Sequence, residues 1–397
     1  MTGAPVLMPA DVRFPLERAN GVQLVKTAAA LAASGRSTTL FVRRSDPRPT
    51  AEVLGLYGVD ADDRLTVERA DVGHRAGAFA LPRLRFLARA GFAAWRALRS
   101  GAVVFTRDLQ LADLVLRASS GPLVYEAHAV EALMYGERGA LYGTAEQPDR
   151  AKAARIAARE ARVWRRAAGF VTTTRGILDS FNAAHGPRAH TRVIPNGTDV
   201  APDRAFPGLA AGTPPRVLYA GQLYPWKGVD VLVRACASVP GARLVILGGL
   251  AGEADAERIR ALVAQCGLAE RTEMPGTVPP ARVADELARA AVVVAPFLHT
   301  AMSERHTSPL KAFEAMAAGR PLVASDLPAS REFLRDGENA LLTPPGDAAA
   351  LADALRRLLD EPALAERIAR GAWDDAPRYA WSARAAALGA LFDEVSA

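Results

Sequence analysis

The sequence has only two cysteines in 397 residues, and this scarcity excludes several classes of protein. Cys236 and Cys266 lie in segments with a helical pattern, so they predict neither a disulfide framework nor a cysteine-rich metal site. The sequence also lacks any run of 18 or more apolar residues, and no cationic-then-apolar stretch opens it. We therefore expect neither a membrane-spanning helix nor a signal peptide, and a reduced, cytoplasmic environment fits best.

The composition that remains is typical of a chain with two domains. A chain of 397 residues, half of them apolar, can bury two separate cores. The formal net charge of +6 favours anionic partners, which include nucleotide diphosphates, acidic lipids and nucleic acids. Charge alone does not choose among these three classes.

The segment from 291 to 326 has the pattern of a strand, a loop, a helix and a second strand. Residues 291–296 and 321–325 are short, apolar and rich in valine, as expected of buried parallel strands. Between them, we expect Ser308 to be the N-cap of a helix and Pro309 to be its first residue. Gly319 stands where a glycine commonly ends a helix.

The start of this predicted helix is suited to an anion. The N–H groups of Leu310 and Lys311 are free at a helix N-terminus, where the helix dipole and the Lys311 charge favour a negative group. Glu314 shares their face of the helix because it follows them by four and three residues. A phosphate on these amides would place the Glu314 carboxylate near the hydroxyls of a ribose. The alternative is an ordinary amphipathic helix in which Lys311 and Glu314 form a surface ion pair.

The sequence SPLKAFEAMAAGRPLVASD, at residues 308–326, resembles the donor site of family-4 glycosyltransferases, which are retaining enzymes of the GT-B fold. The resemblance implies two doubly wound, Rossmann-like α/β domains that face a central cleft. It also implies that Glu314 binds the nucleotide ribose. Another glutamate of the family pattern would fall at position 306, where this chain has His306. That departure implies an unusual donor sugar or a shifted role for Glu304.

Two further segments resemble parts of the same donor site. The sequence GQLYPWKGVDVLVRA is similar to a family segment in which an arginine and a lysine bind the donor diphosphate. Lys227 matches that lysine, whereas Gln222 stands in place of the arginine. The sequence RTEMPGTV resembles a strand whose trailing backbone meets the nucleotide base, which implies contacts at Thr277 and Val278. The implied donor site is completed by Ser308, Leu310 and Lys311.

The first half of the chain opens with the strand–helix–strand pattern of a doubly wound fold, at 6–9, about 22–34 and 38–42. Asn20-Gly21 sits where the family has two glycines that face the donor phosphates, and a plain turn is the alternative. A later strand at 122–126 is followed by His128, at the end of the strand where ligands bind in such sheets. The resemblance implies that His128 lies beside the reacting sugar, and a purely structural histidine is the alternative.

Two other patterns each allow two interpretations. Asp60-Ala-Asp62 matches the metal-binding motif of glycosyltransferases with the GT-A fold, but its neighbours are typical of a solvated turn, which we favour. Residues 82–99 predict a basic amphipathic helix. It is either a domain helix with a charged outer face or, as in family members that act on lipid-linked acceptors, a contact with an anionic membrane.

The expected domain boundaries follow from composition and from the same resemblance. The sequence RVIPNGTD, at 192–199, resembles the family's VIPNGVD, which marks the entry to a linker. We expect an acceptor-binding domain at 1–199, a linker rich in proline, glycine and alanine at 200–215, and a donor-binding domain at 216–378. A terminal helix within 379–397 is expected to pack back onto the first domain.

The resemblance implies transfer of a sugar from a nucleotide-diphosphate sugar to the hydroxyl of a glycan, a lipid-linked acceptor or a secondary metabolite, with retention of configuration. We expect no metal and no cofactor, because Lys227, Lys311 and two helix-terminal amides can stabilise the leaving diphosphate. The candidate catalytic residues are His128, Lys227 and Glu314. A non-catalytic protein that binds sugar nucleotides and a sugar-nucleotide epimerase of the same fold are the alternatives. Nucleic acid is not an expected partner.

Overall fold

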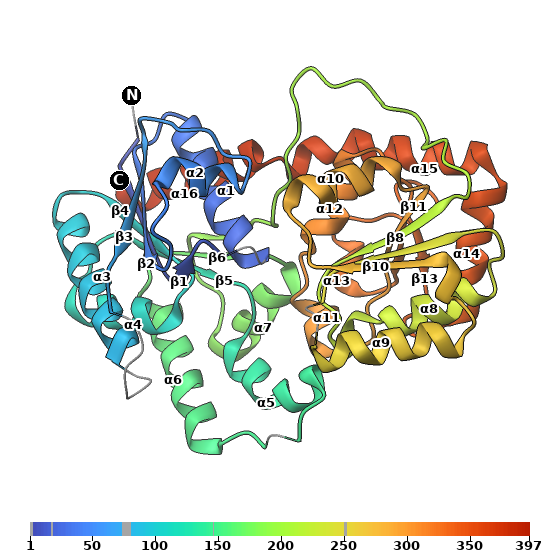
Figure 1. Ribbon diagram of the computed structural model, residues 1–397. Coiled ribbons are helices and arrows are strands. Elements are labelled where there is room, and N and C mark those ends of the chain that lie inside the picture. Colours follow the sequence, from blue (N-terminus) through green and yellow to red (C-terminus); the bar gives the residue numbers. More distant parts are fainter. Residues whose placement is uncertain (1–2, 17–18, 74–80, 146, 250–251) are drawn as a thin grey trace. The chain divides into compact units, whose positions relative to one another are not determined.

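The computed structural model of the chain describes residues 3–16, 19–73, 81–145, 147–249 and 252–397 (Figure 1). These residues form two compact units. Unit 1 consists of Met1–Gly136, Pro148–Gly197 and Trp381–Ala397, and unit 2 consists of Glu137–Gln147 and Thr198–Ala380. Each unit is built around one parallel β-sheet with helices, as the sequence predicted. Within the described residues, no helix combines the length and the apolar character needed to cross a membrane.

The sheet of unit 1 has seven strands in the order β3-β2-β1-β4-β5-β6-β7, and every pair of neighbours is parallel. Its strands are β1 Val6–Phe14, β2 Thr38–Arg44, β3 Leu65–Ala70, β4 Val103–Thr106, β5 Leu123–Ala127, β6 Gly169–Thr172 and β7 Thr191–Val193. Its helices are α1 Ala19–Ala33, α2 Thr50–Gly55, α3 Leu81–Arg99, α4 Leu109–Ala118, α6 Arg150–Arg166, α7 Arg175–His185 and α16 Trp381–Ser396. Helix α5 (Glu131–Tyr142) begins in unit 1, and its residues from Glu137 onward group with unit 2.

Both faces of this sheet are covered, because alternate residues of each strand point to opposite sides. Val103 and Phe105 pack on the face covered by α1 and α16, whereas Val104 packs on the face covered by α3, α4 and α6. This is the doubly wound arrangement expected from the first 42 residues. The strand order reverses between β1 and β4, and ligands bind at the carboxyl ends of strands beside such a reversal.

Unit 2 repeats this plan with a six-stranded parallel sheet in the order β10-β9-β8-β11-β12-β13. Its order reverses between β8 and β11. Its strands are β8 Arg216–Ala220, β9 Arg243–Leu247, β10 Thr272–Gly276, β11 Val292–Ala295, β12 Leu322–Ser325 and β13 Leu341–Thr343. Its helices are α8 Val229–Ala237, α9 Ala254–Gln265, α10 Pro280–Arg289, α11 Ala301–Arg305, α12 Leu310–Ala317, α13 Pro328–Arg331, α14 Ala348–Asp360 and α15 Pro362–Asp375, with short 3₁₀ turns η1 Pro225–Lys227, η2 Ala269–Arg271 and η3 Ala376–Tyr379.

Two predicted boundaries need correction. Helix α12 begins at Leu310, with Pro309 in the capping position, so Ser308 lies one residue outside the cap instead of forming it. Helix α1 begins at Ala19, so Asn20 and Gly21 form its first turn and are not a loop before it. A Cβ atom at position 21 would lie 1.9 Å from the carbonyl oxygen of Leu16, and this close approach explains the glycine.

The segment predicted as a linker is tied to unit 2 along its length. The guanidinium of Arg204 lies 3.9 Å from the ring centroid of Trp373, and Phe206 contacts the same ring edge-on. The buried side chain of Arg320 donates a hydrogen bond to the carbonyl of Gly208. Composition predicted a segment without helix or strand here, and the structure shows one. Composition did not predict that this segment packs against unit 2.

The last helix of the chain, α16, completes unit 1 (Figure 1). It packs against α1, and its buried Leu388, Leu391 and Phe392 belong to the core of that face of the sheet. The side chain of Arg36 donates a hydrogen bond of 2.8 Å to Asp393. The chain therefore leaves unit 1 at Gly197 and returns to it at Trp381.

Candidate active site

In unit 2, the loops that follow β8 and β11 contact each other at the point where the strand order reverses. Gly228 has a φ of +69°, and a Cβ atom there would lie 1.8 Å from the carbonyl oxygen of Pro296. The N–H of Leu298 donates a hydrogen bond of 2.9 Å to the carbonyl of Trp226. These contacts fix the backbone on both sides of the position where a parallel α/β sheet binds its ligand.

Lys227 lies at this position. Its ammonium nitrogen is 3.9 Å from the ring centroid of Trp226 and 4.7 Å from that of Phe297. Burial lowers the pKa of Lys227 to about 7, and none of the described carboxylates forms an ion pair with it. A partly buried cation without a counter-ion is unfavourable, so an anion bound beside Lys227 would be stabilised.

The start of α12 offers a second place for an anion in the same unit. The helix follows the loop after β11 and therefore begins at the carboxyl edge of the sheet. The structure gives no acceptor, among the residues it describes, for the N–H groups of Leu310 and Lys311. The ammonium of Lys311 lies 2.6 Å from Oε2 of Glu314. The ion pair left open by the sequence is thus present here.

The two residues expected to bear on the donor sugar, His306 and Glu304, have distinct environments. His306 is buried at the end of α11, where burial and, to a smaller extent, the charge of Arg305 lower its pKa to about 4. It is therefore neutral at physiological pH and cannot replace a carboxylate. Glu304, the other candidate, lies 2.8 Å from Nε2 of His299.

The remaining predicted donor residues lie on neighbouring loops at the same edge of the sheet. The loops after β9 and β10 are joined by a hydrogen bond of 2.8 Å from the N–H of Gly248 to the carbonyl of Gly276. Next to this bond, the hydroxyl of Thr277 donates to the carbonyl of Gly249 at 3.4 Å, and Val278 follows it. The carbonyl of Gln222 accepts a hydrogen bond of 2.6 Å from the hydroxyl of Tyr219, which fixes the loop after β8.

In unit 1, His128 follows β5, the strand next to β4 on one side of the reversal. Its Nε2 lies 3.2 Å from Oε2 of Glu126, which is the penultimate residue of β5. Burial, together with the charge of Arg107, lowers the pKa of His128 to about 4 against the opposing effect of Glu126. The imidazole is therefore neutral at physiological pH.

Glu126 is the centre of a buried network that the sequence did not reveal. Its carboxylate pairs with Arg384 of α16, and it accepts a hydrogen bond of 3.2 Å from Nε2 of Gln23 of α1. Burial alone would raise the pKa of Glu126, but Arg384 and His128 lower it well below its usual range. Arg107, after β4, donates a hydrogen bond of 2.9 Å to Gln23. The glutamate two residues before His128 was visible in the sequence, whereas nothing pointed to Arg384.

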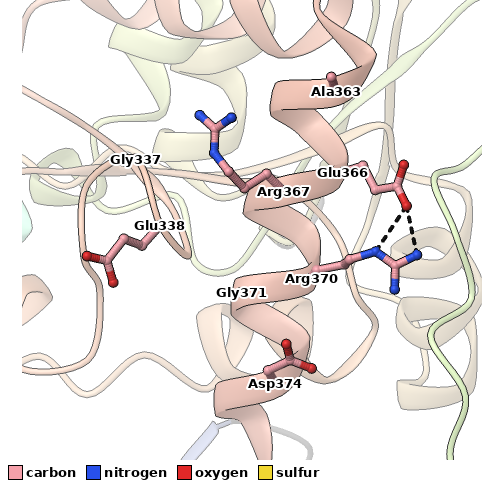
Figure 2. A pocket seen from close by; sticks show the side chains of 8 residues that line it. All are labelled: Gly337, Glu338, Ala363, Glu366, Arg367, Arg370, Gly371 and Asp374. Carbon is pink, nitrogen blue, oxygen red and sulfur yellow. Dashed lines mark hydrogen bonds and ion pairs between the residues drawn. The ribbon is translucent and has the colours of Figure 1, made fainter.

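Two other features lie apart from the residues described above. Asp60 lies on an exposed loop, and the carboxylate of Asp62 accepts a hydrogen bond of 2.7 Å from the N–H of Arg64, as in a solvated turn. A shallow depression of about 580 Å³ lies beside α15, and Figure 2 shows the side chains that line it. None of the predicted site residues lines it. Its lining consists of Gly337, Glu338, Ala363, Glu366, Arg367, Arg370, Gly371 and Asp374.

The comparisons with known proteins match both halves of the chain. Residues 21–197 match the family described as glycosyl transferase 4-like domain, and residues 214–361 match the family described as glycosyl transferases group 1. A D-inositol 3-phosphate glycosyltransferase of Acidothermus cellulolyticus is 35% identical over 53% of this chain and 48% of the relative. A phosphatidyl-myo-inositol mannosyltransferase of Mycobacterium leprae is 37% identical over 51% and 53% of the two chains. The chain thus spans about half the length of these relatives.

A longer match and the solved structures extend over both units. D-inositol 3-phosphate glycosyltransferase 1 of Catenulispora acidiphila is 29% identical over 91% of this chain and 87% of that protein. Sucrose-phosphate synthase from Thermosynechococcus elongatus has a TM-score of 0.75 with 22% identity over 98% of each chain. The HepE protein of Anabaena, in complex with UDP and glucose, has a TM-score of 0.70 with 19% identity over 97% of this chain and 98% of the other. The chain therefore belongs to the group 1, family-4-like glycosyltransferases and has their two-domain GT-B fold.

Proposed function

We propose that the protein transfers a glycosyl group from a nucleotide-diphosphate sugar to an acceptor hydroxyl, with retention of configuration and without a metal ion. The observation that carries this proposal is Lys227, a partly buried cation that lies over two aromatic rings and has no carboxylate partner in the described chain. A diphosphate supplies the missing negative charge. Because the leaving group gains charge during transfer, a cation placed there stabilises the transition state more than the ground state.

Each further residue has a role in this proposal. The amides of Leu310 and Lys311 bind a phosphate oxygen, and Glu314 accepts hydrogen bonds from the ribose. Thr277 and Val278 border the base. His306 lies against the sugar. A neutral imidazole has one acceptor nitrogen, whereas a carboxylate has two acceptor oxygens. His306 therefore favours a donor sugar different from the one that a glutamate at this position would select. His128 orients the transferred sugar.

The relatives indicate which substrates to test first. HepE was solved with UDP, with UDP and glucose, and with UDP-glucose, so UDP is the first nucleotide to try. Two groups of relatives are named for inositol phosphate and phosphatidyl-myo-inositol. Inositol phosphates and inositol lipids are therefore the first acceptors to try.

The experiment is a turnover assay on the purified protein with a panel of UDP-, GDP- and ADP-sugars, each with and without the acceptors. We expect one donor to release its nucleoside diphosphate, faster with acceptor, and the product anomer to match the donor by NMR. A thermal-shift screen identifies the nucleotide beforehand, because a ligand at 100 times Kd stabilises the protein by about 2.7 kcal/mol. Binding with no turnover of any donor would favour the non-catalytic alternative, and a changed free sugar nucleotide would favour an epimerase.

We propose in addition that α3 contacts an anionic membrane. Its buried face contains Phe86, Leu87, Ala90, Ala94 and Leu98. On the opposite face, Leu84, Phe92 and Trp95 are 57%, 60% and 38% exposed, and their spacing places them on one stripe with Leu81. The rings of Phe92 and Trp95 stack, and the guanidinium of Arg99 lies over Trp95. An exposed apolar stripe bordered by arginines is the pattern of a helix that lies in a membrane interface.

A further inference from the structure

The histidine expected beside the sugar lies next to Glu126, a carboxylate that is closed off from solvent. Glu126 is only 2% exposed, and its partner Arg384 is only 3% exposed. Arg384 also donates hydrogen bonds to Thr27 and to the carbonyls of Ile194 and Pro195, at 3.1, 3.0 and 2.9 Å. The arginine is thus fixed by two other parts of unit 1, α1 and the segment after β7, and it fixes Glu126 in turn.

The carboxylate of Glu126 also determines which nitrogen of His128 carries hydrogen. Nε2 of His128 lies 3.2 Å from Oε2 of Glu126, without the alignment of a hydrogen bond. Because an ionised carboxylate repels a lone pair at this distance, hydrogen is favoured on the nitrogen that faces it. Nε2 itself is buried, while 22% of the side chain is exposed. The exposed part of the ring is therefore not Nε2. In a neutral imidazole with hydrogen on Nε2, the lone pair lies on Nδ1.

We infer that Glu126, held by Arg384 and Gln23, is a positioning residue that keeps His128 in the tautomer with hydrogen on Nε2 and an acceptor lone pair on Nδ1. This inference rests on the proposed glycosyl transfer, since it gives His128 the role of accepting a hydrogen bond from a hydroxyl of the transferred sugar. The C-terminal helix thereby acts on the sugar-binding side of unit 1 through two buried side chains. Gln23 and Arg107 complete the arrangement without contacting the sugar.

The decisive measurement is the tautomer of His128 in solution. Protein with ¹⁵N-labelled imidazoles is studied by NMR between pH 5.5 and 8, and the signals of His128 among the six histidines are assigned by loss in the variant His128→Gln. We expect hydrogen on Nε2 and an unprotonated Nδ1 throughout, because Arg107, Arg384 and burial oppose protonation while Glu126 favours it only in part. Hydrogen on Nδ1 in the wild-type protein would overturn the inference, whatever the activity of the protein.

The variant Glu126→Gln provides the functional test. A glutamine amide can donate to Nε2, so hydrogen should move to Nδ1 in a part of the population. We expect kcat to fall by roughly 10- to 100-fold with KM nearly unchanged, since an orienting interaction is lost and the donor-binding unit is intact. Arg384→Lys keeps the charge and should retain much of the activity.

The matched control is Asp393→Asn, which removes the pair between Arg36 and the same helix α16 but leaves Glu126 untouched. It should lower the melting temperature without changing the tautomer or kcat. Equal loss of activity in Asp393→Asn and Glu126→Gln would show that α16 acts by stability alone and would overturn the inference. If the wild-type protein transfers no sugar, the proposed function fails, while the NMR result still decides the positioning of His128.

Discussion

The ammonium group of Lys311 lies 2.6 Å from the carboxylate of Glu314, one turn of α12 apart. The two residues that are expected to meet the phosphate and the ribose of one nucleotide therefore neutralise each other before a ligand arrives. A bound nucleotide would replace this ion pair with two contacts. Lys311 would face a phosphate, and the Glu314 carboxylate would accept hydrogen bonds from the ribose hydroxyls.

The first prediction is that Glu314→Gln weakens nucleotide binding by about 1.5–3 kcal/mol, the range for hydrogen bonds that involve a charged group. The loss should be similar for different sugars on one nucleotide, because the ribose is common to them. Isothermal titration with the nucleoside diphosphate and two sugar nucleotides measures it. Glu366→Gln, on the exposed side of α15, is the control. Unchanged affinity with lower folding stability would identify Glu314 as a partner of Lys311 only.

The second prediction concerns pH and Lys227. The free protein holds this lysine with a pKa of about 7, and a bound diphosphate raises that pKa. Between pH 7 and 9 binding must therefore take up a proton, so the affinity should fall as pH rises, by up to about tenfold per pH unit. Titrations in two buffers of different ionisation enthalpy measure the uptake. Lys227→Met should remove the pH dependence along with most of the affinity, whereas Lys152→Met on α6 should change neither.

The third prediction is that Lys311 replaces the charge missing at Gln222. If so, Lys311→Ala should lower the transfer rate by roughly one to three orders of magnitude, as for other groups that act on developing charge. Gln222→Arg should restore part of the loss. The two changes form a double-mutant cycle on the transfer rate. Strict additivity, with the new arginine no more useful without Lys311 than with it, would rule out compensation.

The fourth prediction is that transfer continues in excess EDTA, with a rate within about twofold of the untreated protein. The physical reason is that, in the proposed site, Lys227, Lys311 and two helix-terminal amides meet the diphosphate charge without a cation. Loss of activity on chelation with recovery in Mn²⁺ would point instead to a metal site, and Asp60-Ala-Asp62 would be the first place to look.

The fifth prediction is that the double variant Phe92→Ser, Trp95→Ser loses binding to vesicles that contain phosphatidylglycerol. Each ring contributes about 1.5–3 kcal/mol when fully buried, so affinity should fall more than tenfold. Cosedimentation measures the bound fraction. Leu133→Ser on α5, an exposed apolar residue away from α3, is the control and should bind as the wild type does. Equal binding by the double variant would leave α3 as a domain helix with a charged face.

The sequence was most informative where a signal is local. Buried strands at 292–295 and 322–325 and the helix between them followed from apolar runs and helix-end residues, with an error of one residue at the start. The turn read at Asn20-Gly21 was wrong because glycine was taken as a loop signal. The cause is the approach of Leu16 to a helical glycine, a tertiary contact that no local pattern encodes.

The network around His128 could not be predicted for the same reason. Arg384 and Glu126 are 258 positions apart, and each alone resembles an ordinary surface charge. The aromatic cradle of Lys227 is an intermediate case. Trp226 is adjacent to Lys227 in sequence, but Phe297 lies in the loop after β11. Phe297 reaches Lys227 only because β8 and β11 are neighbours in the sheet.

The return of the chain to unit 1 at Trp381 has a consequence for biosynthesis. While the ribosome makes unit 2, the sheet of unit 1 is already outside but lacks α16. At about 5–20 residues per second the wait lasts roughly 10 to 40 s. During that time the side chains that pack on Leu388 and Phe392 are uncovered, and Glu126 lacks its ion pair with Arg384. We expect the nascent first unit to depend on chaperones until the last helix is synthesised, and ribosome-bound chains stopped before residue 381 to be cleaved by proteases faster than full-length chains.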